Sequence, residues 1–449
     1  MRAALDINGC ERESSKGRNA TTKSFLPQTS AKTRFSHFFF QMTIPIKVTL
    51  RPGKEIPILR FHPWVFSGAI AHTEGRPEDG DIAAVFDKRG NLLGVGHFHH
   101  GSIAVRLLSF GAADLESENF WIEKLQNALK VRLLAVPQLS ESFNLSESSQ
   151  ALGFRLVHGE GDGLSGLIVD VYENTAVMQC HSIGMHRQRA VIAAALQKVL
   201  GKKLRAVYDK SAESLPPKYA ENQANGYLWS AGENPETSAI IEENGARFRV
   251  DWVTGQKTGF FLDQRDNRHL LAEFAAGKTV LNAFCYTGGF SCLALNAGAS
   301  LVHSVDVSAK AIALCNENVA LNAPFSGEHE GFAEDVLKFL KNSDRDYEVM
   351  VIDPPAYAKS LDKRHNAVQG YKRLNVEAMR RVAPGGILFT FSCSQVVDRE
   401  LFYHTVAAAA MEVGRPVRVL HHLSQSADHP VSLFHPEGSY LKGLVVCVE

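Results

Sequence analysis

The alternation of apolar strands with helical stretches from about residue 253 to the C-terminus constrains the fold of this chain most strongly. The predicted strands are KTVLNAF, LVHSVDV, YEVMVID and GGILFTFS, and helical patterns such as AKAIALCNENVALN and VEAMRRV lie between them. Strands joined through helices run parallel, because each crossover returns the chain to the same end of the sheet. The order therefore predicts a Rossmann-like, doubly wound α/β domain over residues 253–449, closed by the strand pair VRVLHHL and KGLVVCVE, which we interpret as antiparallel.

Two further units are predicted ahead of this domain. Residues 44–112 alternate strand-like runs with turn residues, which predicts a small β-barrel. Residues 115–250 combine the helical patterns NFWIEKLQNALKVRLLA and QRAVIAAALQKVL with short strands, which predicts a central α+β domain. Residues 1–41 show no apolar period, so we interpret them as a disordered extension or a mis-assigned start ahead of Met42. Deleting them is expected to leave the melting temperature and the activity unchanged.

The composition excludes several classes of protein. The 449 residues carry 48 basic and 48 acidic side chains, so binding to nucleic acid would need a local basic patch. The seven cysteines are scattered without a C-x-x-C pair, which argues against a disulfide framework or a zinc knuckle and favours a reducing compartment. No apolar run approaches the roughly 20 residues that cross a bilayer. We therefore expect a cytoplasmic protein with neither a membrane partner nor a metal site.

The first crossover of the C-terminal domain carries the signal for a nucleoside-containing cofactor. The strand Val280–Ala283 runs into FCYTGGF, residues 284–290, where two adjacent glycines allow a tight turn and a close backbone approach to a ligand. Asp306 ends the next strand 18 residues after Gly288, near the offset of about 20 at which an acid meets ribose hydroxyls in nucleotide-binding units. Asp335 follows the third strand, where its carboxylate could accept a hydrogen bond from the amino group of adenine or could cap the N-terminus of a helix.

The glycine pattern favours S-adenosylmethionine over a nicotinamide dinucleotide. The glycines do not form G-x-G-x-x-G, so the sequence does not predict a turn that binds a pyrophosphate. Ahead of the first strand, the run from Gly255 to Arg268 contains Gln264 and Arg265 and combines glycine flexibility, an aromatic pair and many hydrogen-bonding groups. A loop folded over a cofactor explains this run, and a plain helix N-terminus is the alternative.

Two strands end in groups that suit chemistry on a flat base: Tyr347–Ile352 and Gly386–Phe391, which are the fourth and fifth when the strand before Asp335 is counted as the third. The fourth runs into Asp353-Pro354-Pro355-Ala356-Tyr357, whose prolines would stiffen a loop holding the carboxylate. The fifth ends at Cys393, near the start of a helix whose dipole would favour the thiolate. Ligands of doubly wound sheets bind beyond the carboxyl ends of the strands, so these groups should lie near one another. The structural alternatives are a capped Pro-Pro turn and a small buried cysteine.

Taken together, these motifs resemble a known family. The run GQKTGFFLDQRDNR followed by NAFCYTGGFS, HSVDVS, VIDPPAYAKS and FSCSQ is similar to the bacterial large-subunit ribosomal RNA (cytosine-C5)-methyltransferases that carry an N-terminal PUA domain. The segment FHPWVFSG resembles the PUA module of that family, and HGEGDGLSGLIVD resembles its central domain. The resemblance covers residues 44–449.

The resemblance implies a class I S-adenosylmethionine methyltransferase that acts on large-subunit ribosomal RNA or its precursor. It implies a cytosine-pocket role for Asp353 and attack by Cys393 on C6 of the base. The expected contacts to the base come from Pro354, Pro355 and Tyr357. The expected contacts to the cofactor come from Gln264, Arg265, Phe284, Tyr286, Thr287, Gly288, Gly289, Phe290, Asp306 and Asp335. A homodimer is left open.

Several readings of the function remain open at this point. N-methylation of guanine or adenine would leave Cys393 structural, and an RNA-binding assembly factor would keep the fold without the chemistry. Ala356 stands where some RNA cytosine methyltransferases carry a second cysteine, so the base that removes the C5 proton is unidentified. The RNA surface is expected on the β-rich module, from five basic side chains: Lys47, Arg51, Lys54, Arg60 and Arg106.

Overall fold

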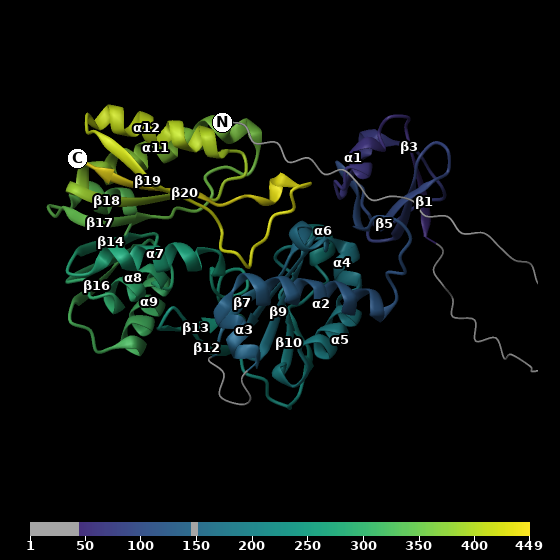
Figure 1. The fold of residues 1–449 in the computed structure, drawn as a ribbon, viewed down its shortest axis with the longest axis horizontal. Coiled ribbons are helices and arrows are strands. Elements are labelled where there is room, and N and C mark those ends of the chain that lie inside the picture. The colour runs from purple at the N-terminus through teal and green to yellow at the C-terminus, as the bar shows by residue number, and fades with distance from the viewer. Residues whose placement is uncertain (1–44, 145–150) are drawn as a thin grey trace, which may run out of the picture. The chain divides into compact units, whose positions relative to one another are not determined.

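The computed structural model describes residues 45–144 and 151–449 (Figure 1). The expectations for residues 1–41 lie outside this range. Four sheets organise the described residues. No helix within them is long and apolar enough to cross a membrane. Short 3-10 turns lie at Ser67–Ala69, Gly159–Asp162, Gly201–Lys203, Leu262–Gln264, Leu361–Lys363 and Pro436–Gly438.

The segment predicted as a small β-barrel forms a six-stranded sheet in the order β2-β6-β5-β4-β1-β3, in which only the pair β1 and β4 is parallel. Asp87 closes the turn between β4 and β5, because its carboxylate accepts the backbone N–H groups of Arg89 and Asn91 at 2.8 Å. The elements are β1 (Ile46–Leu50), α1 (Ile56–Leu59), β2 (Trp64–Phe66), β3 (Ile70–Thr73), β4 (Ile82–Phe86), β5 (Leu92–Phe98) and β6 (Ile103–Ser109).

The central segment builds a five-stranded sheet in the order β11-β10-β9-β8-β7, covered by both predicted helices. The long helices α2 and α5 match the two patterns in the sequence to within one residue. The elements are α2 (Glu118–Ala135), α3 (Pro137–Asn144), β7 (Gly153–His158), β8 (Leu167–Tyr172), β9 (Thr175–Cys180), α4 (Ile183–Arg187), α5 (Arg189–Leu200), β10 (Ala206–Asp209), α6 (Pro217–Ala220) and β11 (Gly226–Ser230).

A hairpin that the sequence analysis did not single out follows this sheet. Its strands β12 (Ser238–Glu243) and β13 (Ala246–Asp251) pair antiparallel around Asn244 and Gly245, both of which have positive φ. An Asn-Gly pair between alternating apolar residues is a strong hairpin signal, so the sequence did contain this element. The backbone N–H of Arg249 donates to Asn318 of the C-terminal domain at 2.8 Å, which joins the hairpin to that domain.

The C-terminal domain confirms the predicted doubly wound sheet. Its seven strands follow the order β16-β15-β14-β17-β18-β20-β19, all parallel except β20, which is antiparallel to both neighbours. The helix expected around VEAMRRV is longer than predicted and starts at Arg364. The elements are α7 (Arg265–Ala275), β14 (Thr279–Ala283), α8 (Gly289–Asn296), β15 (Leu301–Asp306), α9 (Ala309–Asn322), β16 (Glu328–Ala333), α10 (Val336–Asn342), β17 (Tyr347–Ile352), α11 (Arg364–Arg381), β18 (Val382–Ser392), α12 (Arg399–Val413), β19 (Val417–Leu423) and β20 (Lys442–Val448).

Helices cover both faces of this sheet (Figure 1). Helices α10, α11 and α12 enclose one apolar core, and α7 and α8 enclose another on the opposite face. The strand order reverses between β14 and β17, since β15 continues on one side of β14 and β17 lies on the other. Ligands of such sheets bind in the crevice at the carboxyl ends of the strands that flank this switch point.

Acid should destabilise the protein through His97 of β5. This imidazole is buried, neither ring nitrogen has a hydrogen-bond partner among the described residues, and burial lowers its pKa to about 4. In the unfolded chain this imidazole takes up a proton near pH 6.5, whereas in the folded protein it does so only near pH 4. The free energy of unfolding therefore decreases as the pH drops from 6.5 towards 4, by about 2 kcal/mol at pH 5. Urea unfolding at pH 7.5 and pH 5 should show this loss in the parent and in a variant of the exposed His72, H72L. The loss should shrink in H97L, and an equal loss in H97L would contradict the assignment.

Candidate functional site

The turn between β14 and α8 has an unusual backbone. Phe284 and Tyr286 adopt positive φ angles of 61° and 46°, which side chains other than glycine rarely tolerate. Gly288 follows at φ 79°, and a Cβ there would lie 2.5 Å from Sγ of Cys315, so only glycine fits. Such conformations persist where the surroundings enforce them, typically at ligand sites. The turn expected to hold a cofactor is therefore rigid and close to the neighbouring helix.

Asp306 lies beside this turn at the end of β15. Its two carboxylate oxygens accept the backbone N–H groups of Tyr286 at 3.1 Å and of Ser308 at 2.9 Å. The carboxylate thus fixes the turn and has lone pairs left for a ligand. Asp335 is exposed and caps α10, accepting the N–H of Lys338 at 2.9 Å, which is the helix-cap alternative raised from the sequence.

Three of the other expected cofactor contacts are buried in the protein itself. The Phe290 ring lies in the core, 5.9 Å from the ring of Phe391. Thr287 is buried and its carbonyl accepts from Asn318 at 2.9 Å. A Cβ on Gly289 would meet the Arg268 side chain at 2.9 Å. A ligand in the crevice would therefore meet the backbone of this segment and not these side chains.

Asp353 follows β17 and points its carboxylate into the protein. Oδ2 accepts from Nε2 of Gln264 at 2.9 Å, and the Gln264 amide is oriented in turn by Asn267, which donates to its Oε1 at 2.6 Å. Burial and the negative charge of Asp263 raise the pKa of Asp353 to about 7. Two segments 89 residues apart in sequence therefore meet here, and the carboxyl group is poised to hold or release a proton near neutral pH.

Cys393 lies at the end of β18, the strand next to β17. Its Sγ lies 4.0 Å from the carbonyl oxygen of Pro354, so the thiol reaches the loop that begins with Asp353. Burial, together with the negative charges of Asp353 and Asp263, raises the pKa of this thiol to about 11. The expectation that the dipole of α12 would favour the thiolate is therefore wrong for the free protein, because desolvation and two carboxylates outweigh it.

The other residues of the Asp353 loop differ in exposure. Pro354 is buried and Pro355 is exposed. The Tyr357 ring packs against Tyr371 of α11, with the ring centroids 4.7 Å apart and the planes tilted by 42°, and leaves no room for a Cβ on Gly370. The loop therefore packs against α11 through Tyr357, while Pro355 faces solvent.

Two functional candidates were missed in the sequence. Lys442, at the start of β20, is buried and donates through Nζ to the carbonyls of Ser394 and Val397, both at 2.7 Å. Its positive charge opposes the rise of the Cys393 pKa. Asp263 accepts from the Tyr440 hydroxyl at 2.6 Å through Oδ2, while its Oδ1 is buried without a partner among the described residues. A lone lysine opening the apolar run KGLVVCVE was the available signal for Lys442.

Arg265 serves a different purpose from the one expected. Its guanidinium donates to the carbonyl of Gly153 at 2.6 Å and pairs with Asp428 at 3.0 Å. Arg268, one helical turn later, forms a bidentate pair with Glu243 of β12 at 2.6 and 2.8 Å. Helix α7 is therefore bonded to the central segment and the hairpin, and Gln264 beside it is the member of the run that faces Asp353.

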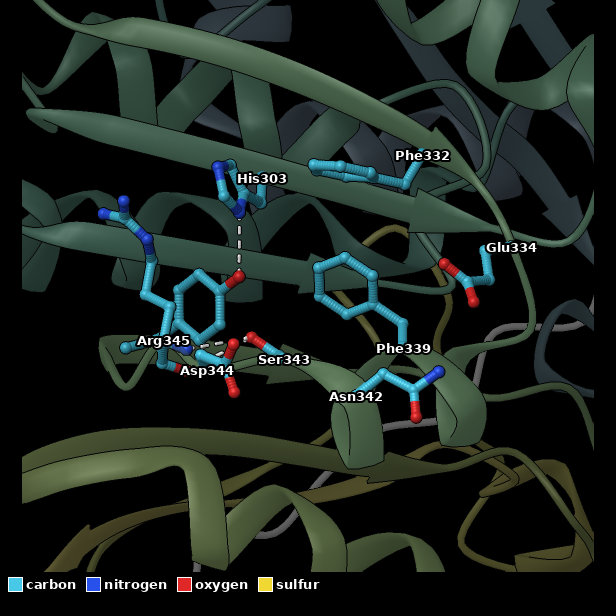
Figure 2. Close-up of a pocket in the computed structure, with 9 residues that line it drawn as sticks. His303, Phe332, Glu334, Phe339, Asn342, Ser343, Asp344 and Arg345 are labelled. Atoms are coloured by element: carbon cyan, nitrogen blue, oxygen red, sulfur yellow. Dashed lines mark hydrogen bonds between the residues drawn. The ribbon is translucent and has the colours of Figure 1, made fainter.

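A separate cavity of about 600 Å³ lies beside β15, β16 and α10 (Figure 2). Phe332 and Glu334 line the end next to Asp335, and His303 and Tyr347 line the other end, bonded to each other at 2.8 Å. None of the groups around Asp353 and Cys393 lines it. We assign no ligand to it.

Comparison with known proteins identifies the class of this site. Residues 202–425 match the model of the S-adenosylmethionine-dependent methyltransferases, and residues 48–110 match a PUA-like domain. The chain is 40% identical over 403 residues to the ribosomal RNA large subunit methyltransferase I of Pseudoalteromonas atlantica, covering 89% of this chain and 98% of that protein. The chain belongs to the ribosomal RNA large subunit methyltransferase I family. The relative of the same name from Aeromonas hydrophila is 38% identical over 405 residues, covering 89% of this chain and 98% of its own.

Solved structures agree on the fold. A structure described as a SAM-dependent methyltransferase from Streptococcus mutans superposes with a TM-score of 0.74 at 22% identity, covering 90% of this chain and all of that one. SMU.776, a methyltransferase complexed with SAH, superposes with a TM-score of 0.75 at 21% identity over the same shares of both chains. These structures support the fold alone, whereas the family model and the curated relatives make the protein an S-adenosylmethionine-dependent methyltransferase of large-subunit ribosomal RNA.

The crevice has groups that fit S-adenosylmethionine. Asp306 offers acceptors for ribose hydroxyls at the end of β15, next to the rigid Phe284–Gly288 turn. Oδ1 of Asp263, buried without a partner in the part of the chain that the structure describes, is an acceptor of the right charge for the ammonium group of the methionine moiety. These residues would hold the cofactor, which supplies an electrophilic methyl group when bound.

Replacing Asp306 by alanine is expected to weaken cofactor binding by about 1.5 to 3 kcal/mol, the usual cost of a lost hydrogen bond to a charged group. Because Asp306 also fixes the backbone of Tyr286 and Ser308, the D306N variant serves as a control that keeps the shape of the side chain and one of the two acceptors for these N–H groups. Calorimetry with S-adenosylhomocysteine should rank the parent above D306N and D306N above D306A. Equal affinities in all three would remove Asp306 from the cofactor site.

Proposed function

We propose that this enzyme methylates C5 of a cytosine in large-subunit ribosomal RNA through a covalent bond between Cys393 and C6 of the base. The observation that carries the proposal is the meeting of a thiol and a protonatable carboxyl group at the ends of the neighbouring strands β18 and β17. Cytosine C5 is a poor nucleophile, so methylation at carbon needs a group that first adds to C6, and a thiol supplies it. Transfer to a ring nitrogen, which already has a lone pair, needs no such group.

Addition begins when the Cys393 sulfur forms a bond to C6. The C5=C6 electron pair shifts into the ring, and N3 gains the proton that Asp353 donates. The Asp353 carboxylate left behind accepts the proton released by the thiol, so protons balance within the site. Gln264, which donates to Oδ2 of Asp353, fixes the orientation of this carboxyl group.

The adduct makes C5 nucleophilic. C5 then takes the methyl group as the bond from that methyl to sulfur breaks, and the electron pair of that bond stays on the sulfur of the departing cofactor product. Solvent water accepts the C5 proton, the C5=C6 double bond re-forms, and the bond between C6 and the Cys393 sulfur breaks with its electron pair on sulfur. The N3 proton then returns through Asp353 to the thiolate, so the thiol and the carboxyl group are both regenerated. Lys442, buried against the Ser394 and Val397 carbonyls, adds a positive charge that favours the thiolate at this step.

Other residues of the site would shape the base pocket or position the catalytic groups. The exposed Pro355 and the backbone beside Pro354 would form one wall of the base pocket, and Tyr357 would stiffen it through its contact with Tyr371. We assign Arg265 to positioning Gln264, because its own donors are occupied by Gly153 and Asp428. The target base must be unstacked or unpaired to reach the site, as for other enzymes that modify bases.

Nucleoside analysis tests the proposed product. Large-subunit RNA lacking this modification is incubated with the enzyme and S-adenosylmethionine carrying a deuterated methyl group, and the RNA is then digested for mass spectrometry. The proposal requires the label in 5-methylcytidine. Label in an N-methylated guanosine or adenosine would overturn it and leave Cys393 with a structural role.

A further inference from the structure

Three exposed phenylalanines from distant parts of the chain form one aromatic patch. Phe61 follows α1, Phe110 follows β6 and Phe434 lies in the long loop between β19 and β20. The Phe61 ring is 5.4 Å from the Phe110 ring and 5.2 Å from the Phe434 ring. The three side chains are 51%, 43% and 51% exposed, respectively, so their contact with one another leaves large faces open.

The backbone at Phe61 argues against a purely structural role. Its φ is 63°, and its N–H and that of His62 bond back to Ile58 and Pro57 in the manner of a helix end that glycine usually occupies. A bulky side chain in this conformation is strained, and a half-exposed ring recovers little of that cost through burial. A strained residue kept at an open surface points to a function.

Positive charges without an ion pair among the described residues lie on the segment that carries Phe61. Arg51, Lys54 and Arg60, on either side of α1, are exposed, and no ion pair involving them occurs among the described residues. By contrast, Lys47 pairs with Glu74 at 3.0 Å, and Arg106 is partly buried. Of the five basic residues expected to bind RNA, three therefore have no acidic partner among the described residues and lie on the segment that carries Phe61, although Nε of Arg51 donates to the Ile70 carbonyl at 3.1 Å.

The loop that supplies Phe434 also reaches the methyltransferase site. At one end of it, Ser426 donates its N–H to the Asp263 carbonyl at 2.9 Å, and at the other end Tyr440 bonds to the Asp263 carboxylate. Between these contacts, the His435 ring lies 4.3 Å from the Trp64 ring of β2. One loop thus contacts both the β-rich module and the catalytic crevice.

We propose that the aromatic patch of Phe61, Phe110 and Phe434 binds unpaired bases of the ribosomal RNA substrate by stacking, while Arg51, Lys54 and Arg60 bind the adjacent phosphates. Single-stranded RNA is recognised by this combination of open aromatic faces and a basic surface. A second copy of the chain is the weaker occupant, because a two-fold interface would set these unpaired cations against themselves. The proposal rests on the ribosomal RNA substrate of the family and is independent of the cytosine-C5 chemistry.

The test is binding of a short single-stranded RNA of uridines that contains one 2-aminopurine, whose fluorescence falls on stacking. Full-length F61L and F434L should each weaken binding by roughly five- to a hundredfold, the range for one stacked base, and should lose the quenching. The salt dependence should stay as in the parent, since no phosphate contact is removed. R60Q should instead reduce the salt slope by about 0.7, the value for one phosphate contact on a single strand, and keep the quenching. Y403L, which alters an exposed tyrosine on α12 outside the patch, should match the parent.

Two further results separate this role from its alternatives. F61G relieves the strained backbone, so its melting temperature should equal or exceed that of the parent while RNA binding falls, a combination that damaged folding cannot produce. Unchanged affinity and quenching in F61L and F434L would overturn the proposal. A parent dimer that dissociates in both variants at unchanged RNA affinity would also overturn it and assign the patch to a second copy. Because only binding is measured, these outcomes do not depend on which base is methylated.

Discussion

The C393A variant is expected to lose methyl transfer by at least about a thousandfold while its affinity for S-adenosylhomocysteine stays close to that of the parent. The thiol is the group that makes C5 nucleophilic, so its removal leaves no other route to a carbon nucleophile. The side chain is only partly buried, so we expect its removal to cost about 1 kcal/mol of folding free energy. The measurement is single-turnover methylation of unmodified large-subunit RNA.

Cys447 provides the matched control for this experiment. It is also a partly exposed free cysteine, and it lies on β20 with its Sγ 3.7 Å from the Gly385 carbonyl, away from Asp353. C447A should methylate at the parent rate. If C393A retains a rate within tenfold of the parent, the thiol is structural and nitrogen methylation becomes the better account.

The D353N variant is expected to lose methylation by about 100- to 10,000-fold, the usual contribution of a positioned acid or base. An amide can donate a hydrogen bond to N3 of cytosine but cannot transfer the proton or accept the one that leaves Cys393. In the parent, the protonated form of Asp353 is required, and its pKa is about 7. The parent rate should therefore fall as the pH rises above 7, and this fall should vanish in D353N. D335N, at the exposed cap of α10, should retain the parent profile.

The same carboxyl group should make the parent less stable at high pH. The pKa of Asp353 is raised in the folded protein, so the unfolded chain releases this proton at a lower pH than the folded protein does. The free energy of unfolding therefore decreases as the pH rises from about 4 to 7. D353N lacks this loss and should melt at a higher temperature than the parent at pH 8. A lower melting temperature at pH 8 together with full activity would show that Asp353 serves the fold and not the chemistry.

Much of the fold could be predicted because its main elements follow local patterns. The strands of the C-terminal sheet are apolar runs separated by helical stretches, and that order alone predicts parallel strands. The hairpin at Ser238–Asp251 is predictable as well, because apolar residues alternate along it and Asn244-Gly245 marks its turn. The length of α11 was underestimated because residues 364–375 are polar enough to look like a loop.

The candidate site was predictable only where a rule connects sequence position with location in space. The rule that ligands bind at the carboxyl ends of parallel strands places Asp353 and Cys393 at one rim, and the structure has them on adjacent strands. No such rule joins Lys442 to Ser394, or Tyr440 to Asp263, because these contacts span 48 and 177 residues. The roles expected of Arg265 and of the Cys393 thiolate were misjudged for the same reason. Both depend on burial and on charges that only the folded chain brings near.

Capture of the covalent intermediate tests the central claim most directly. Large-subunit RNA with 5-fluorocytosine at the target position is incubated with the enzyme and S-adenosylmethionine, and the protein is digested for mass spectrometry. Fluorine cannot leave as the C5 proton does, so we predict that the methylated base stays attached to the peptide that contains Cys393, and that C393A forms no adduct. An enzyme that methylates natural RNA to completion yet forms no adduct with the fluorinated RNA, or forms one at another residue, would contradict the account.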